Sequence, residues 1–194
     1  MGQVWQALHS PTGAVVAVKI MERGRVDEPL ARAAFQAEVR AQACLDHPGL
    51  VRVHDHGVVP EGVVAASIVP GSPWLAMDFA PYGSLDRYLA PLSWHGVRTL
   101  LLAVLDALAH AHARRVVHRD LKAGNLLVFR LPDQAGGAPE VRISDFGVAH
   151  ALRSDDSLLP FSGTPRAMAP EQFRGELADQ GPWTDLYALG CLAW

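Results

Sequence analysis

The sequence predicts an α+β protein of two lobes, in which a small β-rich lobe precedes a mainly helical one. Short β-branched runs dominate the first 80 residues. The sequence Pro-Tyr-Gly at residues 81–83 then interrupts the chain, and the longest stretch with a helical spacing of apolar residues follows it. Because proline and glycine commonly mark structural boundaries, we place the boundary between the lobes at this break.

The clearest strand is expected at residues 15–20, where the β-branched sequence VVAVKI is apolar on both sides of Lys19. The turn-forming sequence SPTG precedes it at residues 10–13, and residues 4–7 form a second, mostly apolar run. The two runs and the turn between them predict a β-hairpin at the start of the chain.

A helix is expected next, at residues 27–46. Apolar residues recur there at steps of three and four, which is the spacing of one helix face. The sequence His-Pro-Gly at residues 47–49 ends this helix, because proline cannot continue it. Apolar runs at residues 51–53 and 74–79 predict two further strands in the same lobe.

The second part of the chain contains the strongest amphipathic pattern, which predicts a helix at residues 93–114. Two short runs, at residues 126–129 and 141–144, predict a pair of strands. Residues 145–171 have no steady period and are expected to form a long ordered loop. Another apolar helix is expected to begin at residue 183, so helices dominate this lobe.

Composition and charge exclude several classes of protein. The 194 residues are 49% hydrophobic and 19% charged, which argues against a disordered chain. A net charge of −3 excludes a nucleic-acid binder that relies on global positive charge. The apolar stretch at residues 100–113 is too short and too polar to cross a bilayer, and the first residues do not resemble a signal peptide. We therefore expect no membrane segment and no nucleic-acid partner.

Cysteine usage indicates a reducing compartment. Cys44 and Cys191 are far apart in the chain and form neither a zinc-ligand spacing nor a disulfide framework. We expect two ordinary buried thiols and a cytoplasmic location. A histidine pair at residues 110 and 112 has no acid or cysteine close to it in sequence, so a metal site is not expected there.

Four motifs in a fixed order carry the chemistry. The strongest is HRDLKAGN at residues 118–125, which lies between a predicted helix and a predicted strand. Asp-Phe-Gly follows at residues 145–147 and Ala-Pro-Glu at residues 169–171, while Val-Ala-Val-Lys precedes them at residues 16–19 with Glu38 on the next helix. This ordered set resembles the eukaryotic-type (Hanks-type) protein kinase family over the whole chain, and it looks most like the bacterial members.

The resemblance implies a two-lobed kinase-like fold. Residues 1–80 would form a small antiparallel β lobe with one helix that binds the nucleotide, and residues 81–194 a mainly helical catalytic lobe. It also implies transfer of the γ-phosphoryl group of ATP to serine or threonine hydroxyls of protein substrates, with self-phosphorylation as one such reaction. Lys122 and Thr164 are typical of the serine/threonine-specific members.

The resemblance also implies a role for each catalytic residue. Asp120 would accept or orient the proton of the substrate hydroxyl, and Lys122 would neutralise charge on the transferred group. Asn125 and Asp145 would bind Mg²⁺ through oxygen atoms, as a hard cation prefers. Thr164 would bond the catalytic aspartate and lysine and shape the substrate groove.

Nucleotide binding is expected to depend on Lys19, which would hold the α- and β-phosphates while Glu38 fixes it through an ion pair. The other nucleotide contacts implied by the resemblance are Gly2 in the glycine-rich loop, Val4 and Ala17 above the base, Leu127 below it, Met77 at the back, and Asp78, Phe79 and Ala80 in the hinge. For Val4, Ala17 and Leu127 a plain core role fits equally well.

Several features depart from the family pattern. Only Gly2-Gln3-Val4 remains of the glycine-rich loop, and the sequence stops within the central helix of the large lobe. The chain is therefore expected to be a fragment truncated at both places. Gln42 lies where the family usually packs a leucine, which leaves a buried amide in need of partners.

Two other functions stay open beside a serine/threonine kinase. A catalytically inactive pseudokinase that binds nucleotide or a partner is favoured by the incomplete glycine-rich loop and by Gln42. The intact Lys19, Asp120 and Asp145 argue against it. A small-molecule kinase of related fold is opposed by the Ala-Pro-Glu and Gly-Thr-Pro sequences, because these shape a peptide groove in the family.

Overall fold

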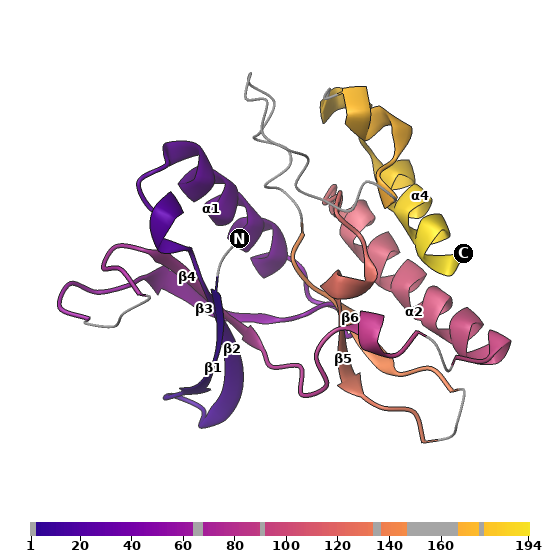
Figure 1. The fold of residues 1–194 in the computed structure, drawn as a ribbon, viewed down its shortest axis with the longest axis horizontal. Helices are drawn as coiled ribbons and strands as arrows, with labels where there is room; N and C mark the ends of the chain where they lie inside the picture. Colours follow the sequence, from indigo (N-terminus) through magenta and orange to yellow (C-terminus); the bar gives the residue numbers. More distant parts are fainter. Residues whose placement is uncertain (1–2, 64–67, 90–91, 134–136, 147–166, 175–176) are drawn as a thin grey trace.

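The computed structural model describes residues 3–63, 68–89, 92–133, 137–146, 167–174 and 177–194. A four-stranded sheet with one helix occupies one side of the molecule, and two long helices occupy the other, with a two-stranded sheet between them (Figure 1). All strand pairs within the two sheets are antiparallel. The predicted α+β class and the kinase-like arrangement are confirmed.

The four-stranded sheet has the strand order β1-β2-β4-β3. Its strands are β1 (Gln3–His9), β2 (Ala14–Ile20), β3 (Val53–Val58) and β4 (Pro73–Asp78). The expected hairpin joins β1 to β2, and its turn needs Gly13, which has a φ of +67° that favours glycine. β2 therefore lies in the middle of the sheet, which places Lys19 between two neighbouring strands.

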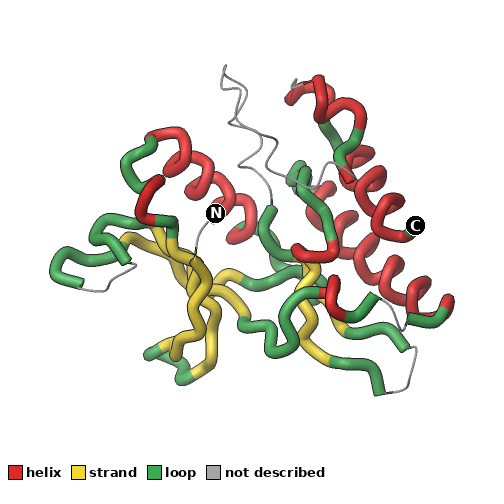
Figure 2. The backbone as a smooth tube through the Cα atoms, in the orientation of Figure 1, coloured by secondary structure: helices red, strands yellow, loops and turns green. Residues whose placement is uncertain are grey.

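Helix α1 (Pro29–Ala43) covers this sheet, as the tube in Figure 2 shows. Pro29 occupies its first turn, where the missing N–H of proline is not needed. The helix and the sheet share one apolar core, and each fully buried leucine or phenylalanine of such a core is worth about 1.5–3 kcal/mol. The core residues are Ala17, Met21, Val26, Ala31, Phe35, Val39, Val51, Leu75 and Met77.

The helical side is built on α2 (Trp94–Ala113) and α4 (Pro182–Ala193), which pack against each other. Ser93 caps α2 by accepting a hydrogen bond of 3.1 Å from the Gly96 amide. Strands β5 (Leu126–Arg130) and β6 (Glu140–Ile143) form the two-stranded sheet. Short 3₁₀ helices lie at Arg23–Arg25, between β2 and α1, and in the rest of the chain at Leu85–Arg87, Ala123–Asn125, Pro170–Arg174 and Leu177–Asp179.

A second apolar core lies between α2, α4 and the β5–β6 pair. Its centre is almost completely buried and includes Leu85, Ala107, Leu126, Val128, Ile143 and Phe146. The two lobes are joined beside this core by backbone hydrogen bonds, because the Val51 amide donates to Ile143 and the Ile143 amide donates to Gly49, both at 2.9 Å. The segment after α1 is thereby attached to the strand that leads to Asp145.

Two details of the expected structure are wrong. The third strand begins at Val53 and ends at Val58, later than the expected residues 51–53. Its polar sequence gave no strand signal. Such a sequence is tolerated because β3 is an edge strand whose side chains are mostly exposed. Cys44 and Cys191 are exposed and not buried thiols.

The loop expected at residues 145–171 falls largely outside the described residues. In the part of the chain that the structure describes, no helix is both long enough and apolar enough to cross a membrane.

Candidate active site

Three charged side chains from different parts of the sequence meet at the junction of the lobes. Nζ of Lys19 in β2 lies 2.6 Å from Oε1 of Glu38 in α1 and 2.7 Å from Oδ1 of Asp145, which follows β6. The expected ion pair of Lys19 and Glu38 is therefore present. Lys19 also joins the two lobes directly, because Asp145 belongs to the catalytic lobe of the expected fold.

The electrostatics of this cluster keep the lysine charged. Burial lowers the pKa of the Lys19 ammonium, but the two carboxylates outweigh burial and raise this pKa above its usual value. Burial raises the pKa of the Asp145 carboxyl, yet the charge of Lys19 holds it below its usual value. Burial, supported by the charge of Asp145, raises the pKa of the Glu38 carboxyl despite the pull of Lys19.

One aspartate, Asp185, holds the loop at residues 118–120 in place. The carboxylate of Asp185 in α4 accepts hydrogen bonds from the backbone amides of His118 and Arg119, both at 2.8 Å. Arg119 has a φ of +65°, a strained value for a residue with a side chain. The buried carboxylate stabilises this turn.

Asp120 lies within this loop and is bonded by two nearby side chains. Lys122 donates from Nζ to its Oδ2 at 2.7 Å. Asn125 donates from Nδ2 to the same oxygen at 3.2 Å and to the Asp120 backbone carbonyl at 2.8 Å. Because all three lie within six residues, the tight loop followed by the turn Ala123–Asn125 is sufficient to bring them together.

His118 connects the loop to the segment that carries Asp145. Its Nδ1 accepts from the Asp120 amide at 3.2 Å, so its Nε2 carries the hydrogen that is donated to the Ser144 carbonyl at 2.9 Å. Its ring also packs on Phe146, with ring centroids 4.8 Å apart. This fully buried histidine therefore fixes the positions of Asp120 and Asp145 relative to each other.

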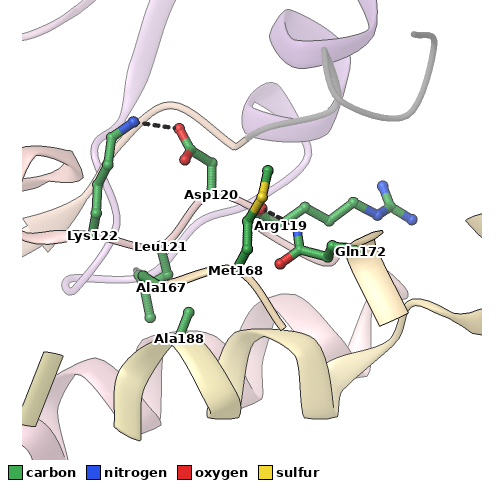
Figure 3. Close-up of a pocket in the computed structure, with 8 residues that line it drawn as sticks. All are labelled: Arg119, Asp120, Leu121, Lys122, Ala167, Met168, Gln172 and Ala188. Carbon is green, nitrogen blue, oxygen red and sulfur yellow. Dashed lines mark hydrogen bonds and ion pairs between the residues drawn. The ribbon is translucent and has the colours of Figure 1, made fainter. Parts of the chain in front are cut away.

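A small pocket of about 20 Å³ borders the same loop (Figure 3). The Gln172 amide donates from Nε2 to the Arg119 carbonyl at 2.8 Å, and its Oε1 accepts from the Ala169 amide at 3.0 Å. Leu121, Ala167 and Met168 also line the pocket, and Ala188 of α4 lies below them in Figure 3. The segment around Ala-Pro-Glu is thereby fastened beside Asp120.

The remaining expected nucleotide residues are placed as follows. Ala17 and Met77 are buried in the small-lobe core, and Leu127 packs against that core from β5. Val4 is 59% exposed on β1, so the core alternative does not apply to it. Ala80 follows β4 and is partly exposed. Gly2 and Thr164 lie outside the described residues.

A backbone hydrogen bond brings the two expected metal ligands, Asn125 and Asp145, close to each other. Asn125 accepts from the Ser144 amide at 2.9 Å through its carbonyl, and Asp145 is the next residue. The amide nitrogen of Asn125 donates to Asp120, so its amide oxygen is the atom that a metal would contact. Among the described residues no three His, Cys, Asp or Glu side chains gather to hold a metal. This donor set fits Mg²⁺, which is commonly bound by one or two protein oxygens together with phosphates.

Sequence reasoning missed three supporting groups. His112 contributes Nε2 to a contact of 2.7 Å with Asp185. Ser144 supplies the carbonyl that His118 binds, and Gln172 supports Arg119. Partners 26 to 73 residues apart leave no local sequence signal, although Ser144 and Gln172 directly adjoin recognised motifs.

Gln42 behaves as the sequence analysis expects. It is only 2% exposed, and neither Nε2 nor Oε1 has a hydrogen-bond partner among the described residues. It lies one helical turn after Glu38, on the same face of α1. The helix therefore carries a buried, unsatisfied amide next to the residue that fixes Lys19.

Comparisons with known proteins agree with this geometry. A family described as the protein kinase domain matches residues 1–194. The chain is similar to serine/threonine-protein kinase Pkn1 of Myxococcus xanthus, at 35% identity over 201 residues, and to serine/threonine-protein kinase PknA of Mycobacterium tuberculosis, at 34% over 202 residues. These matches cover 100% of the chain but 26% and 43% of the two relatives, so the chain spans less than half of their length.

Solved structures show the same likeness. The kinase domain of M. tuberculosis PknI superposes with a TM-score of 0.70 at 28% identity, covering 100% of this chain and 66% of that domain. The likeness extends over the full length of this chain. The chain therefore belongs to the protein kinase domain family, with bacterial serine/threonine kinases among its relatives.

Proposed function

We propose that this chain forms the catalytic part of a serine/threonine protein kinase that uses ATP and Mg²⁺. The observation that carries the proposal is Lys19, whose ammonium contacts both Glu38 and Asp145 at the junction of the lobes. One cation held there by two carboxylates is suited to bind phosphate groups beside a metal. The family match supports the same activity.

In the proposed reaction, the oxygen of a substrate hydroxyl forms a bond to the γ-phosphorus of ATP. The bond from that phosphorus to the bridging oxygen breaks, and ADP leaves. Asp120 accepts the hydroxyl proton or orients it. Lys122, whose Nζ lies 2.7 Å from Oδ2 of Asp120 in this structure, neutralises charge on the transferred group. Lys19 holds the α- and β-phosphates, and Thr164 helps to shape the substrate groove.

Mg²⁺, bound by Asp145 and Asn125, would supply charge neutralisation for the phosphates. The adenine would bind at the hinge formed by Asp78, Phe79 and Ala80, with Ala17, Leu127 and Met77 as apolar surroundings. Val4 of β1 and Gly2 are proposed as further nucleotide contacts. The two apolar cores, one under the four-stranded sheet and one between the long helices, support lobes of residues 1–80 and 81–194.

The substrates proposed are proteins with serine or threonine hydroxyls, including the chain itself. Lys122 and Thr164 support this choice over tyrosine, because serine/threonine kinases of the family carry them at these positions. Since the reaction consumes ATP, we propose a cytoplasmic location.

Transfer of labelled γ-phosphate to a generic basic protein tests the proposal. The wild-type chain is expected to transfer phosphate, whereas Asp120→Asn should lower the initial rate by at least a hundredfold, because general base catalysis contributes 10²–10⁴-fold. Asp133→Asn, at an exposed aspartate outside the site, serves as the matched control and should keep the wild-type rate. Equal rates for wild type and Asp120→Asn would contradict the role of Asp120.

A pseudokinase is the second candidate, and the buried, unsatisfied amide of Gln42 is the observation that favours it. An unsatisfied amide one helical turn from Glu38 weakens the packing of α1, and the Lys19–Glu38 ion pair depends on that packing. Binding of Mg²⁺ and ATP to the wild-type chain, measured by calorimetry, together with no transfer above background would establish this alternative.

A further inference from the structure

A second charged contact joins the four-stranded sheet to β6. At the end of β4, Oδ2 of Asp78 accepts a hydrogen bond of 2.7 Å from Nη1 of Arg142 in β6. The backbone amide of Arg52 donates to the same oxygen at 3.3 Å, and Nε2 of His54 in β3 lies 2.8 Å from the other oxygen. One carboxylate is thus bound by groups from both sheets.

Arg142 is held in place from several sides. Its guanidinium carbon lies 4.1 Å from the centroid of the Phe129 ring, and its Nη2 donates to Glu140 at 3.5 Å. The side chains of Asp78 and Arg142 are 18% and 27% exposed. Water therefore screens this ion pair less than it screens a surface pair.

The strands that this contact connects are the ones that position the site. β4 pairs with β2 so that Leu75 lies opposite Lys19. Asp78 lies three residues further along β4, opposite Val16. Arg142 precedes Asp145 by three residues on the other side of the junction. The Asp78–Arg142 pair therefore joins the four-stranded sheet to β6, and the Lys19–Asp145 pair joins the same sheet to the segment just after β6.

We propose that Asp78 and Arg142 are positioning residues whose ion pair sets the placement of the two lobes so that Lys19 meets Asp145. The carboxylate of Asp78 serves this contact and not the nucleotide, whereas the hinge role expected of Asp78 concerns its backbone. The catalytic consequence rests on the proposed kinase function, because during transfer Lys19 would bind phosphate and Asp145 would bind the metal. Their mutual contact then no longer joins the lobes, and the Asp78–Arg142 pair still does.

Carbodiimide coupling of the 194-residue chain tests this placement without any need for activity. The reagent activates a carboxylate, the contacting amine forms an amide bond with it, and the carboxylate oxygen leaves as part of a urea. Lys19 lies within 2.7 Å of both Glu38 and Asp145, so either can be coupled to it. Mass spectrometry of the linked peptides gives the ratio of the Lys19–Asp145 product to the Lys19–Glu38 product. The second product forms within one lobe and serves as the internal reference.

Arg142→Gln is expected to lower this ratio at least threefold, and Arg142→Lys, which keeps the charge, should restore most of it. Arg130→Gln is the matched control, since Arg130 makes an exposed ion pair with Glu140 at 3.4 Å on the neighbouring strand and should leave the ratio unchanged. An unchanged ratio in Arg142→Gln, or an equal fall in Arg130→Gln, overturns the proposal.

Asp78→Asn keeps the shape of the side chain and provides the second variant. It should lower the ratio as much as Arg142→Gln, and the double variant should lower it no further, because both remove one interaction. Additive falls would show that the two residues act separately and would overturn the proposal. In the active enzyme the same variants should lower kcat more than they raise KM for ATP, with Arg142→Lys restoring kcat. Absence of transfer in the wild type would contradict the proposed function and leave the coupling result intact.

Discussion

Lys19 is the single residue on which most of the site depends. It balances two carboxylates on opposite sides of the junction between the lobes, of which Glu38 is largely buried and Asp145 is 36% exposed. Its removal leaves Glu38 and Asp145 without their cation, and two carboxylates in one site cannot both stay ionised at low cost. The effect of removing Lys19 should therefore depend on pH.

Lys19→Met is expected to lower the thermal midpoint more at pH 8 than at pH 5. Without Lys19, burial and repulsion raise the folded-state pKa of the two carboxyls above their ordinary values of 4.5 and 3.8. A carboxyl whose pKa is raised on folding favours the folded state only while it is protonated, so the penalty grows as the pH rises above those values. Thermal melts of Lys19→Met and of the exposed-site variant Arg130→Met at both pH values check this. An equal loss at pH 5 and pH 8 for Lys19→Met would show that the two carboxylates are not coupled through Lys19.

At the scale of the element, helix α1 combines a useful and a costly side chain on one face. Glu38 must enter the junction to bond Lys19, and Gln42 enters with it because it lies one turn further along. A buried polar group without a partner costs about 1–3 kcal/mol. The packing of α1 against the sheet is therefore less stable than it would be with an apolar residue at position 42.

Gln42→Leu is expected to raise the free energy of unfolding by about 1–2 kcal/mol, because it removes the unsatisfied amide and keeps a similar volume. Gln36→Leu, on the exposed face of the same helix, should change it by less than about 0.5 kcal/mol. Urea unfolding followed by circular dichroism measures both. Destabilisation by Gln42→Leu would mean that the amide has a partner that stabilises the fold.

At the scale of the whole molecule, Asp185 connects three distant segments. Its fully buried carboxylate binds the amides of His118 and Arg119 and the side chain of His112, so α4, the loop at residues 118–120 and α2 meet at one group. The loop that carries Asp120 is thus positioned by a residue more than sixty positions away in sequence.

Asp185→Asn is expected to destabilise the fold by about 3 kcal/mol, since an amino group would replace one acceptor oxygen and face a donor. Asp179→Asn, at an exposed side chain just before α4, is the control and should be nearly neutral. Chemical unfolding gives the two free energies. A similar small change in both would show that Asp185 does not stabilise the loop.

The sequence by itself determined the local features of this protein. The hairpin that contains Lys19, the helix that carries Glu38 and the helix at residues 93–114 follow from apolar spacing and turn residues, which act over a few positions. The loop from Asp120 to Asn125 is likewise compact in sequence, so its bonds could be anticipated from the motif. Membership of the family followed from the order of four such motifs.

Only the tertiary structure decided which distant groups meet. The polar β3 strand forms because β4 offers it an edge, and its own residues give little indication of a strand. The Asp78–Arg142 contact, the bond from His112 to Asp185 and the support of Arg119 by Gln172 join residues 53 to 73 positions apart. Such pairs leave no period in one sequence, because their geometry is set by how the sheets and helices pack and not by the residues on either side.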